Sequence, residues 1–137
     1  MKILEVLTKR RQIGNVGERA AAKHLSRHGY KILEKNYVTL GYETDIIAKN
    51  KDTVVFVEVK TRTVGKPSPK EPRPASAVTP EKQRKLISCA KSYMASNYTL
   101  KGRIRFDVIE VMLDEDGRVH SINHLEAAFN YNTAYKN

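Results

Sequence analysis

Two acids and one lysine, Asp45, Glu58 and Lys60, form the most informative candidate for a catalytic site in this sequence. Asp45 precedes a turn at residues 50–52, and Glu58 and Lys60 lie in the apolar segment 53–62 that follows it. If the two segments form a β-hairpin, the side chains of all three residues can share one face of a sheet. Carboxylates are ligands that Mg²⁺ and Mn²⁺ prefer, and a nearby lysine can orient or deprotonate water. The pattern predicts a metal-dependent hydrolytic site.

The geometry of that site depends on the hairpin register. We expect Lys49 to face Asp52 across the turn, which pairs Asp45 with Phe56. Asp45 and Glu58 are then diagonal neighbours, roughly 7–8 Å apart at the backbone. A turn one residue longer would move one set of side chains to the opposite face. The alternative interpretation is a solvated Glu–Lys pair on an exposed strand, with Asp45 facing water.

The charge of the chain favours a polyanionic partner. Its 25 Lys and Arg residues outnumber 15 Asp and Glu residues, which gives a net charge of +10. A cationic surface of this size attracts the phosphates of nucleic acids. Ribosomes and anionic lipids are the alternative partners. Together with the predicted metal site, the charge suggests cleavage of a nucleic-acid backbone.

The length and composition limit the classes of protein that this chain can represent. A chain of 137 residues is long enough for one compact domain, which we assign to residues 1–137. We find no run of the roughly 20 apolar residues that a membrane span needs, and the N-terminus is too short and charged for a secretory signal. The single cysteine, Cys89, cannot form an internal disulfide. We therefore expect a cytoplasmic protein without membrane association.

The N-terminal third predicts one helix. Residues 1–13 are expected to form a loosely held arm or a short helix. Asn15 is typical of a helix N-cap, and Glu18 occupies the capping-box position three residues later. Gly29 is a natural C-terminal stop.

The remainder predicts a mixed α/β fold in which a central β-sheet is flanked by helices. Thr79 and Pro80 are typical of the N-cap and first residue of a second helix. The chain between the strand at 53–62 and the strand at 103–113 is long enough for a parallel crossover. We expect a flexible, proline-rich basic loop at about 63–78. The predicted order is α-β-β-β-α-β-β, with strands at 30–33, 37–48, 53–62, 103–113 and 119–122 and a short closing helix at 125–129.

Two strand patterns carry further expectations. Val55 and Val57 should point to one face of the sheet, and Phe56 and Glu58 to the other. Asp107 is an acid within a predicted strand, and the simplest expectation is an ion pair with Arg105 or another neighbouring base.

Motifs distributed along nearly the whole chain resemble, in their order, those of the YraN-like family of small bacterial proteins. They are Gly14-x-x-Gly17-Glu18-x-x-Ala21, Gly29-Tyr30-x-Ile32-Leu33-x-x-Asn36-Tyr37, Glu43-x-Asp45-Ile46-Ile47-Ala48, Phe56-Val57-Glu58-Val59-Lys60-x-Arg62, Ala77-Val78-Thr79-x-x-Lys82-Gln83, Arg105-Phe106-Asp107-Val108 and Ala128-Phe129. The family is predicted to be endonuclease-like. Its core is similar to archaeal Holliday-junction resolvases and to the restriction-endonuclease-like PD-(D/E)XK fold.

The resemblance implies roles for individual residues. It implies that Asp45, Glu58 and Lys60 form the catalytic core, with Asp45 and Glu58 as ligands of Mg²⁺ or Mn²⁺. Glu18 matches a helix glutamate that approaches the metal site in resolvase-like proteins. Lys82 and Gln83 match a helix motif near that site. The candidate nucleic-acid contacts are Lys9, Arg10, Arg11, Arg62, Lys82, Gln83 and Arg84.

The chain departs from the family pattern at two loops beside the site. Tyr42 precedes Glu43 where the family commonly has glycine, and the segment after Arg62 is proline-rich and lacks the usual Phe-Gly. Both departures bear on substrate access rather than on the core residues.

Residues and resemblance together predict a Mg²⁺- or Mn²⁺-dependent endodeoxyribonuclease that acts on DNA, with branched or single-stranded structures as candidate substrates. The resemblance also suggests a homodimer. The first alternative is a nucleic-acid-binding protein that keeps the nuclease fold without turnover, and the second is a structural or regulatory interaction protein.

Overall fold

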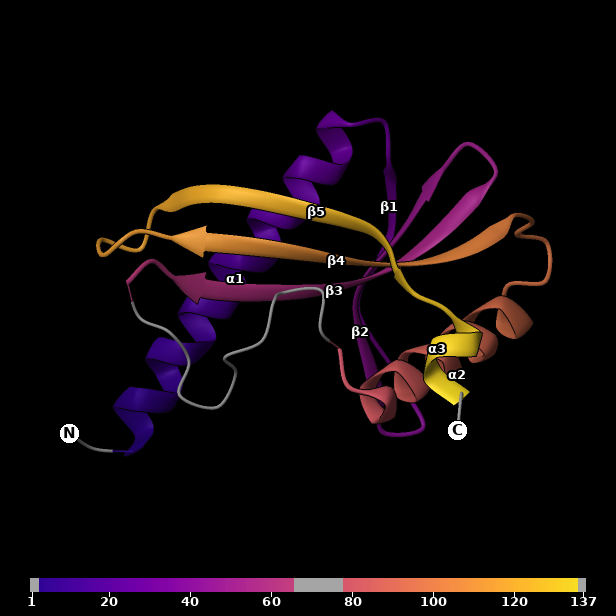
Figure 1. Cartoon of the computed structure of the whole chain (residues 1–137), viewed down its shortest axis with the longest axis horizontal. Helices are drawn as coiled ribbons and strands as arrows, with labels where there is room; N and C mark the ends of the chain where they lie inside the picture. The colour runs from indigo at the N-terminus through magenta and orange to yellow at the C-terminus, as the bar shows by residue number, and fades with distance from the viewer. Residues whose placement is uncertain (1–2, 66–77, 136–137) are drawn as a thin grey trace.

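The chain forms a five-stranded sheet with helices on both faces (Figure 1). In this computed structural model, residues 3–65 and 78–135 are described, so most of the predicted loop at 63–78 lies outside the described residues. No helix in the described ranges is long and apolar enough to cross a membrane. The elements are α1 (Ile3–Arg27), β1 (Lys31–Thr39), β2 (Tyr42–Asn50), β3 (Thr53–Thr63), α2 (Pro80–Ser96), β4 (Arg103–Leu113), β5 (Val119–Phe129) and α3 (Tyr131–Tyr135).

The sheet is mixed, with strand order β1-β2-β3-β4-β5. The pair β3–β4 is parallel and the other neighbouring pairs are antiparallel. Helix α2 lies in the connection between the parallel strands, as a crossover requires. It begins as predicted, because Thr79 accepts a hydrogen bond from the Lys82 amide and Pro80 is the first helical residue. The predicted fold class and element order are confirmed.

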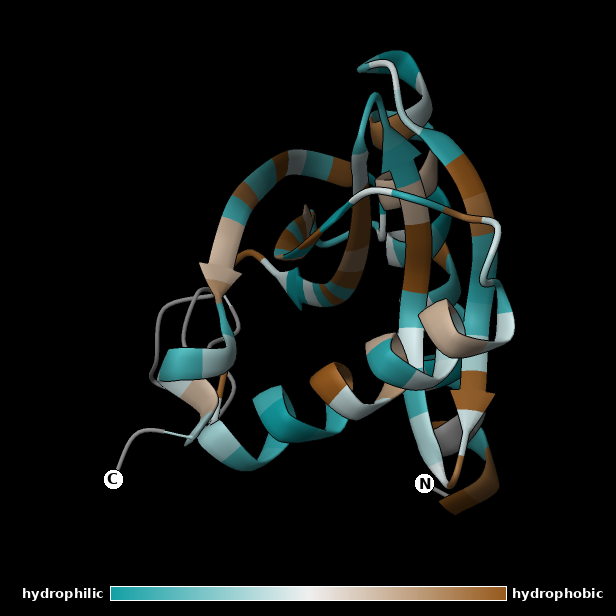
Figure 2. Ribbon diagram, turned by 90° about the vertical axis from the view of Figure 1, so that its right-hand side faces the viewer, coloured by the Kyte–Doolittle hydropathy of each residue, from teal (hydrophilic) through white to brown (hydrophobic). Residues whose placement is uncertain are grey.

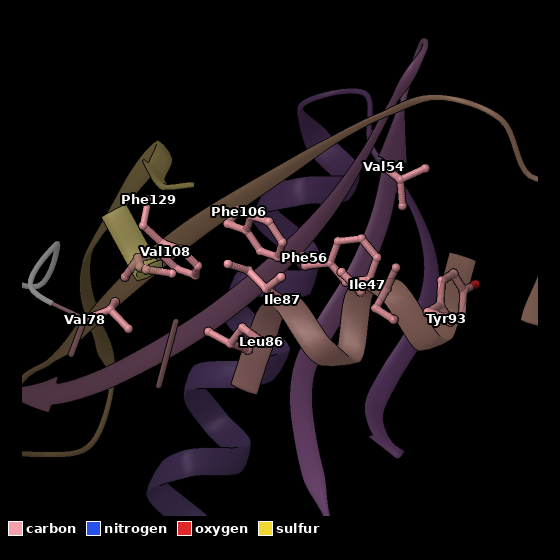
Figure 3. Packing of buried hydrophobic residues seen from close by; sticks show 12 residues of the cluster. Ile47, Val54, Phe56, Val78, Leu86, Ile87, Tyr93, Phe106, Val108 and Phe129 are labelled. Atoms are coloured by element: carbon pink, nitrogen blue, oxygen red, sulfur yellow. The ribbon is translucent and has the colours of Figure 1, made fainter. Parts of the chain in front are cut away.

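Strand β3 separates two apolar cores because its side chains alternate between the faces of the sheet. Phe56 belongs to the cluster under α2 and α3, whereas Val55 and Val57 belong to the cluster under α1. Figure 3 shows Leu86 and Ile87 of α2 packed toward the aromatic side chains of the first cluster. Hydrophobic segments accordingly occupy the middle of the central strands (Figure 2). The predicted alternation of this strand is confirmed.

Helix α1 is longer than predicted. It begins at Ile3, so the expected boundary at Asn15 is wrong and Glu18 is not a capping-box residue. The helix continues through this region because Ile13 and Val16 pack against the core under α1, and such burial outweighs the local preference of Asn for caps. Its C-terminus is as predicted: Gly29 has a φ of +86°, and the Tyr30 amide donates to the Leu25 carbonyl at 3.0 Å.

Two strand boundaries also differ from the prediction. Residues 37–48 do not form one strand, because a turn at Leu40 and Gly41, both with positive φ, divides them between β1 and β2. The predicted closing helix at 125–129 is instead the end of β5, where Phe129 pairs with Phe106. A short helix, α3, follows one residue later.

The β2–β3 register is shifted by two residues from the prediction. Asn50 pairs with Thr53, and Ile47, not Asp45, pairs with Phe56. The turn therefore contains only two residues, Lys51 and Asp52, and the positive φ of Lys51 suits such a tight turn. Because the shift is even, each side chain keeps its predicted face.

The crossing of α1 over β3 requires a glycine. A Cβ atom at Gly17 would collide with the hydroxyl oxygen of Thr61 on β3. The absence of a side chain at Gly17 therefore sets how closely α1 approaches the sheet, and it sets the position of the adjacent Glu18.

We predict that Gly17→Ala destabilises the protein by about 1–3 kcal/mol, because the helix or Thr61 must move to admit the methyl group. Urea unfolding measures the change. Gly14→Ala is the matched control on the same helix, since a Cβ atom there meets no described atom within 4 Å. Better helix propensity should stabilise that variant by up to about 1 kcal/mol. Equal effects of the two substitutions would contradict the close approach.

Asp107 on β4 is completely buried and is the centre of a polar network. Its carboxylate accepts two hydrogen bonds from Arg105, each 2.8 Å long, one from His124 at 2.7 Å and one from the Ala127 amide at 3.0 Å. Burial raises the pKa of Asp107, but these hydrogen bonds outweigh burial and the net pKa is lowered. The predicted pairing with Arg105 is confirmed.

We predict that Asp107→Asn costs about 3 kcal/mol of unfolding free energy at neutral pH, because Arg105 loses its buried anionic partner. Because the folded-state pKa is lowered, this stabilisation is present above the unfolded pKa and is lost as the pH falls through the folded value. The difference between Asp107→Asn and wild type should therefore shrink in acid. Glu110→Gln, on the same strand, removes only a half-buried pair with Arg62 at 3.7 Å and should cost less than about 1 kcal/mol.

Candidate metal and nucleic-acid site

The site lies where β2 leaves β3. The paired residues of the two strands end at Ile46 and Val57. Beyond them the Asp45 carboxylate accepts a hydrogen bond from the Val59 amide at 2.8 Å. The Asp45 side chain thus accepts from the Val59 amide in place of the backbone carbonyl that β2 would have supplied if the pairing had continued. The steep angle between the β1–β2 hairpin and strands β3–β5 is visible in Figure 1.

Glu58 precedes Val59 on β3, and its side chain lies on the face of the sheet that α2 covers. Its side chain is 17% exposed, and its Oε1 atom lies 3.7 Å from the ammonium group of Lys82 on α2. Lys60, two residues further along β3, is also half-buried and contributes a second favourable charge. The structure therefore brings together Asp45, Glu58 and Lys60, and it adds Lys82.

The two carboxylates disfavour each other's ionisation. The pKa of Asp45 is raised to about 7. Burial is the largest cause and the neighbouring Glu58 charge is the next, whereas the hydrogen bond from the Val59 amide lowers the pKa. Burial also raises the pKa of Glu58, in spite of the opposing charges of Lys82 and Lys60. Two half-buried acids whose pKa values are raised together are typical of a site that takes up a cation or a proton.

Glu18 reaches the edge of this site from α1. With its amide nitrogen turned toward the carboxylates, Asn36 on β1 donates to Glu18 Oε2 at 3.2 Å and to Glu43 Oε1 at 3.3 Å. Burial and the Glu43 charge raise the pKa of Glu18, while Asn36 and Lys35 oppose the shift. The Glu18 charge in turn raises the pKa of Asp45. Glu18 therefore interacts electrostatically with Asp45.

The residues present fit a hard divalent cation. Within the described ranges, no three His, Cys, Asp or Glu side chains form a group arranged to hold a metal ion. A site based on Asp45 and Glu58 therefore offers two carboxylates, and Mg²⁺ commonly binds to one or two carboxylates and keeps several waters. The raised pKa values of this pair indicate that a cation would relieve an existing electrostatic cost.

The predicted nucleic-acid contacts are distributed over three elements. Lys9, Arg10 and Arg11 lie on the N-terminal half of α1, where Lys9 and Arg11 are exposed. Arg62 forms a pair with Glu110 at 3.7 Å. Arg84 is exposed on α2 and donates to the Ala134 carbonyl at 2.9 Å.

Gln83 has an internal role in this structure. It is 8% exposed; its amide nitrogen donates to the Val78 carbonyl at 2.7 Å, and its amide oxygen accepts from Thr133 at 2.8 Å. The side chain therefore joins the start of α2 to α3 instead of facing solvent. Lys82, the preceding residue, faces Glu58.

The sequence interpretation missed the contributions of Asn36 and Glu43. Alternation along β2 could have indicated Glu43, because it lies two residues from Asp45. Asn36 has a φ of +51°, a left-handed conformation that Asn tolerates better than most residues, but its sequence context gives no sign of this. Its role depends on the approach of α1, which sequence periodicity does not specify.

Comparisons with known proteins give one consistent family. A family model described as "Uncharacterised protein family UPF0102" matches residues 17–111. A UPF0102 protein of Chlorobium phaeobacteroides is 42% identical over 121 residues, covering 85% of this chain and 92% of its own. A UPF0102 protein of Caldanaerobacter subterraneus is 44% identical, covering 88% of this chain and 96% of its own. A UPF0102 protein of Clostridium acetobutylicum is 40% identical, covering 87% of this chain and 94% of its own.

We predict that Asp45→Asn stabilises the protein at pH 8 by about 1–3 kcal/mol in the absence of divalent ions. The folded-state pKa, about 7, is above the ordinary value of 3.8, so ionised Asp45 opposes folding at high pH. The folded state binds the extra proton between about pH 4 and 7, so the advantage of the asparagine should decline as the pH falls. The asparagine oxygen can still accept from Val59.

Urea unfolding in EDTA between pH 5 and 8 measures this trend. Asp52→Asn is the control, since it makes the same chemical change at a side chain that is 73% exposed in the turn between the same strands. A constant difference between Asp45→Asn and wild type would contradict the raised pKa.

Proposed function

The chain belongs to the uncharacterised protein family UPF0102, and we propose that it is a Mg²⁺- or Mn²⁺-dependent endonuclease that hydrolyses phosphodiester bonds in DNA. The observation that carries the proposal is the pair of half-buried carboxylates, Asp45 and Glu58, with raised pKa values and two lysines beside them. Such a pair is expensive in a structural role, because an apolar pair at the same positions would avoid the burial of like charges.

Each residue of the site has a role in the proposed reaction. Asp45 and Glu58 would hold the divalent ion. The bound ion would offset negative charge on the scissile phosphate and make its water more acidic. The Lys60 ammonium group orients the attacking water and faces the phosphate. Glu18, whose pKa is also raised, assists by accepting a hydrogen bond or proton from water at the edge of the site.

Binding of DNA in this proposal depends on the excess of basic residues. The net charge of +10 favours phosphate contacts irrespective of base sequence. Lys9 and Arg11 are exposed on α1, the helix that also carries Glu18, so a strand held along this helix would be guided toward the site. Branched and single-stranded DNA are the candidate substrates.

A second candidate function is DNA binding without turnover. It is favoured by the observation that Glu58 already has a cationic partner, Lys82, and by the small number of ligands that the described residues offer a metal ion. Steep salt dependence of DNA binding with no cleavage in Mg²⁺ or Mn²⁺ would support this alternative.

We predict that the purified protein cleaves branched or single-stranded DNA in Mg²⁺ or Mn²⁺, and that Asp45→Ala and Lys60→Ala each reduce the rate by about 100-fold or more. The reason is that the first variant loses a metal ligand and the second loses the group that orients water. Gel assays with labelled oligonucleotides measure the rates, and EDTA should abolish cleavage.

Asp52→Ala is the matched control for these variants. Asp52 is an acid of the same hairpin whose side chain is 73% exposed, and its loss should leave the rate unchanged. Cleavage that survives in both Asp45→Ala and Lys60→Ala would overturn the proposed function.

A further inference from the structure

We propose that Lys82 is a counterion of the site: its ammonium group pairs with the Glu58 carboxylate until a divalent cation displaces it. The inference rests on the proposed function, because it assumes that Glu58 binds the metal ion. It assigns to α2 a part in metal binding: the helix supplies a competing positive charge.

The contact between Lys82 and Glu58 is suited to exchange. The ammonium group lies 3.7 Å from Glu58 Oε1, which is an ion pair but longer than a good hydrogen bond. The Lys82 side chain is 45% exposed, whereas Glu58 is 17% exposed. The lysine can therefore swing into solvent with little loss of packing, while the carboxylate stays in place.

The position of Lys82 is set by the start of α2. The Lys82 amide donates to the Thr79 hydroxyl at 3.2 Å, which caps the helix. The next residue, Gln83, is anchored to the Val78 carbonyl and to Thr133. These hydrogen bonds hold the first turn of α2 beside Glu58. The backbone of Lys82 therefore has a fixed position next to the site.

Helix stability does not account for a lysine at this position. A positive charge in the first turn is repelled by the partial positive charge of the helix N-terminus. Lys85, one turn later, forms an ordinary surface pair with Glu81 at 3.4 Å. Lys82 instead lies 3.7 Å from the half-buried Glu58 carboxylate, and its charge is the largest of those that lower the pKa of Glu58.

The charges of the site explain what the exchange accomplishes. Asp45 and Glu58 together offer two negative charges when both are ionised, and one lysine offsets only part of them. A divalent ion held by Asp45 and Glu58 would offset both negative charges and would repel the ammonium group of Lys82. The released Lys82 then remains near the site, where it can contact a phosphate of the incoming strand.

The test is Mn²⁺ binding to wild type and to Lys82→Met, measured by titration calorimetry at neutral pH and low salt. Methionine keeps an unbranched side chain and removes the charge. We expect Lys82→Met to bind Mn²⁺ more tightly, by about 3- to 10-fold, because no ammonium group has to be displaced. Lys85→Met removes the same charge one helical turn away and should change the affinity by less than about 2-fold. Lys82→Arg keeps the charge and should bind Mn²⁺ about as wild type does.

The outcomes separate the two proposals. If wild type binds Mn²⁺ and Lys82→Met binds it equally or more weakly, the counterion role is wrong and the metal site stands. If Lys82→Met and Lys85→Met tighten binding equally, the effect is one of net charge and the specific role is wrong. If wild type binds no Mn²⁺, the proposed function fails and this inference fails with it.

Discussion

The arrangement of the site depends on one hydrogen bond, between the Asp45 carboxylate and the Val59 amide. At this point β2 diverges from β3, and the backbone donor of Val59 would otherwise lack the partner that a regular ladder provides. The carboxylate fills that position and is thereby fixed beside Glu58. The divergence also opens the edge of the sheet to Glu18 from α1 and to Lys82 from α2. Four charged side chains from four elements therefore meet where a pair of strands separates.

The fully buried Asp107 and the half-buried Asp45 show how the partners of an acid decide whether its charge supports the fold or opposes it. Asp107 is surrounded by donors from Arg105, His124 and Ala127, and its pKa is lowered. Asp45 has one backbone donor and faces the carboxylate of Glu58, and its pKa is raised to about 7. The first acid stabilises the folded state at neutral pH, and the second destabilises it. A residue retained at such a cost points to a role in binding or catalysis.

The fold tolerates that cost because the two apolar cores lie away from the charged edge. The cluster under α2 contains Phe56 and Leu86, and the cluster under α1 contains Val57 and Leu25. Both cores include residues of β3, so the strand that carries Glu58 and Lys60 is anchored on both faces at its N-terminal half. A rigid strand of this kind can hold ionisable groups at a set distance while their charges change.

Features that depend on local periodicity and local chemistry could be predicted from the residues alone. Alternation in residues 53–62 predicted that Glu58 lies on the same face of the sheet as Phe56 and on the opposite face from Val57. Thr79 and Pro80 predicted the start of α2. Matching motifs also identified the YraN-like family, which is the family described as UPF0102. Four features depend on long-range packing and could not be predicted in this way: the start of α1, the two-residue shift of the hairpin, the bridge from Asn36 to Glu18 and the pairing of Lys82 with Glu58. The physical reason is that backbone periodicity is set by neighbours along the chain, whereas the approach of α1 at Gly17 and of α2 at Glu58 is set by the packing of side chains far apart in sequence.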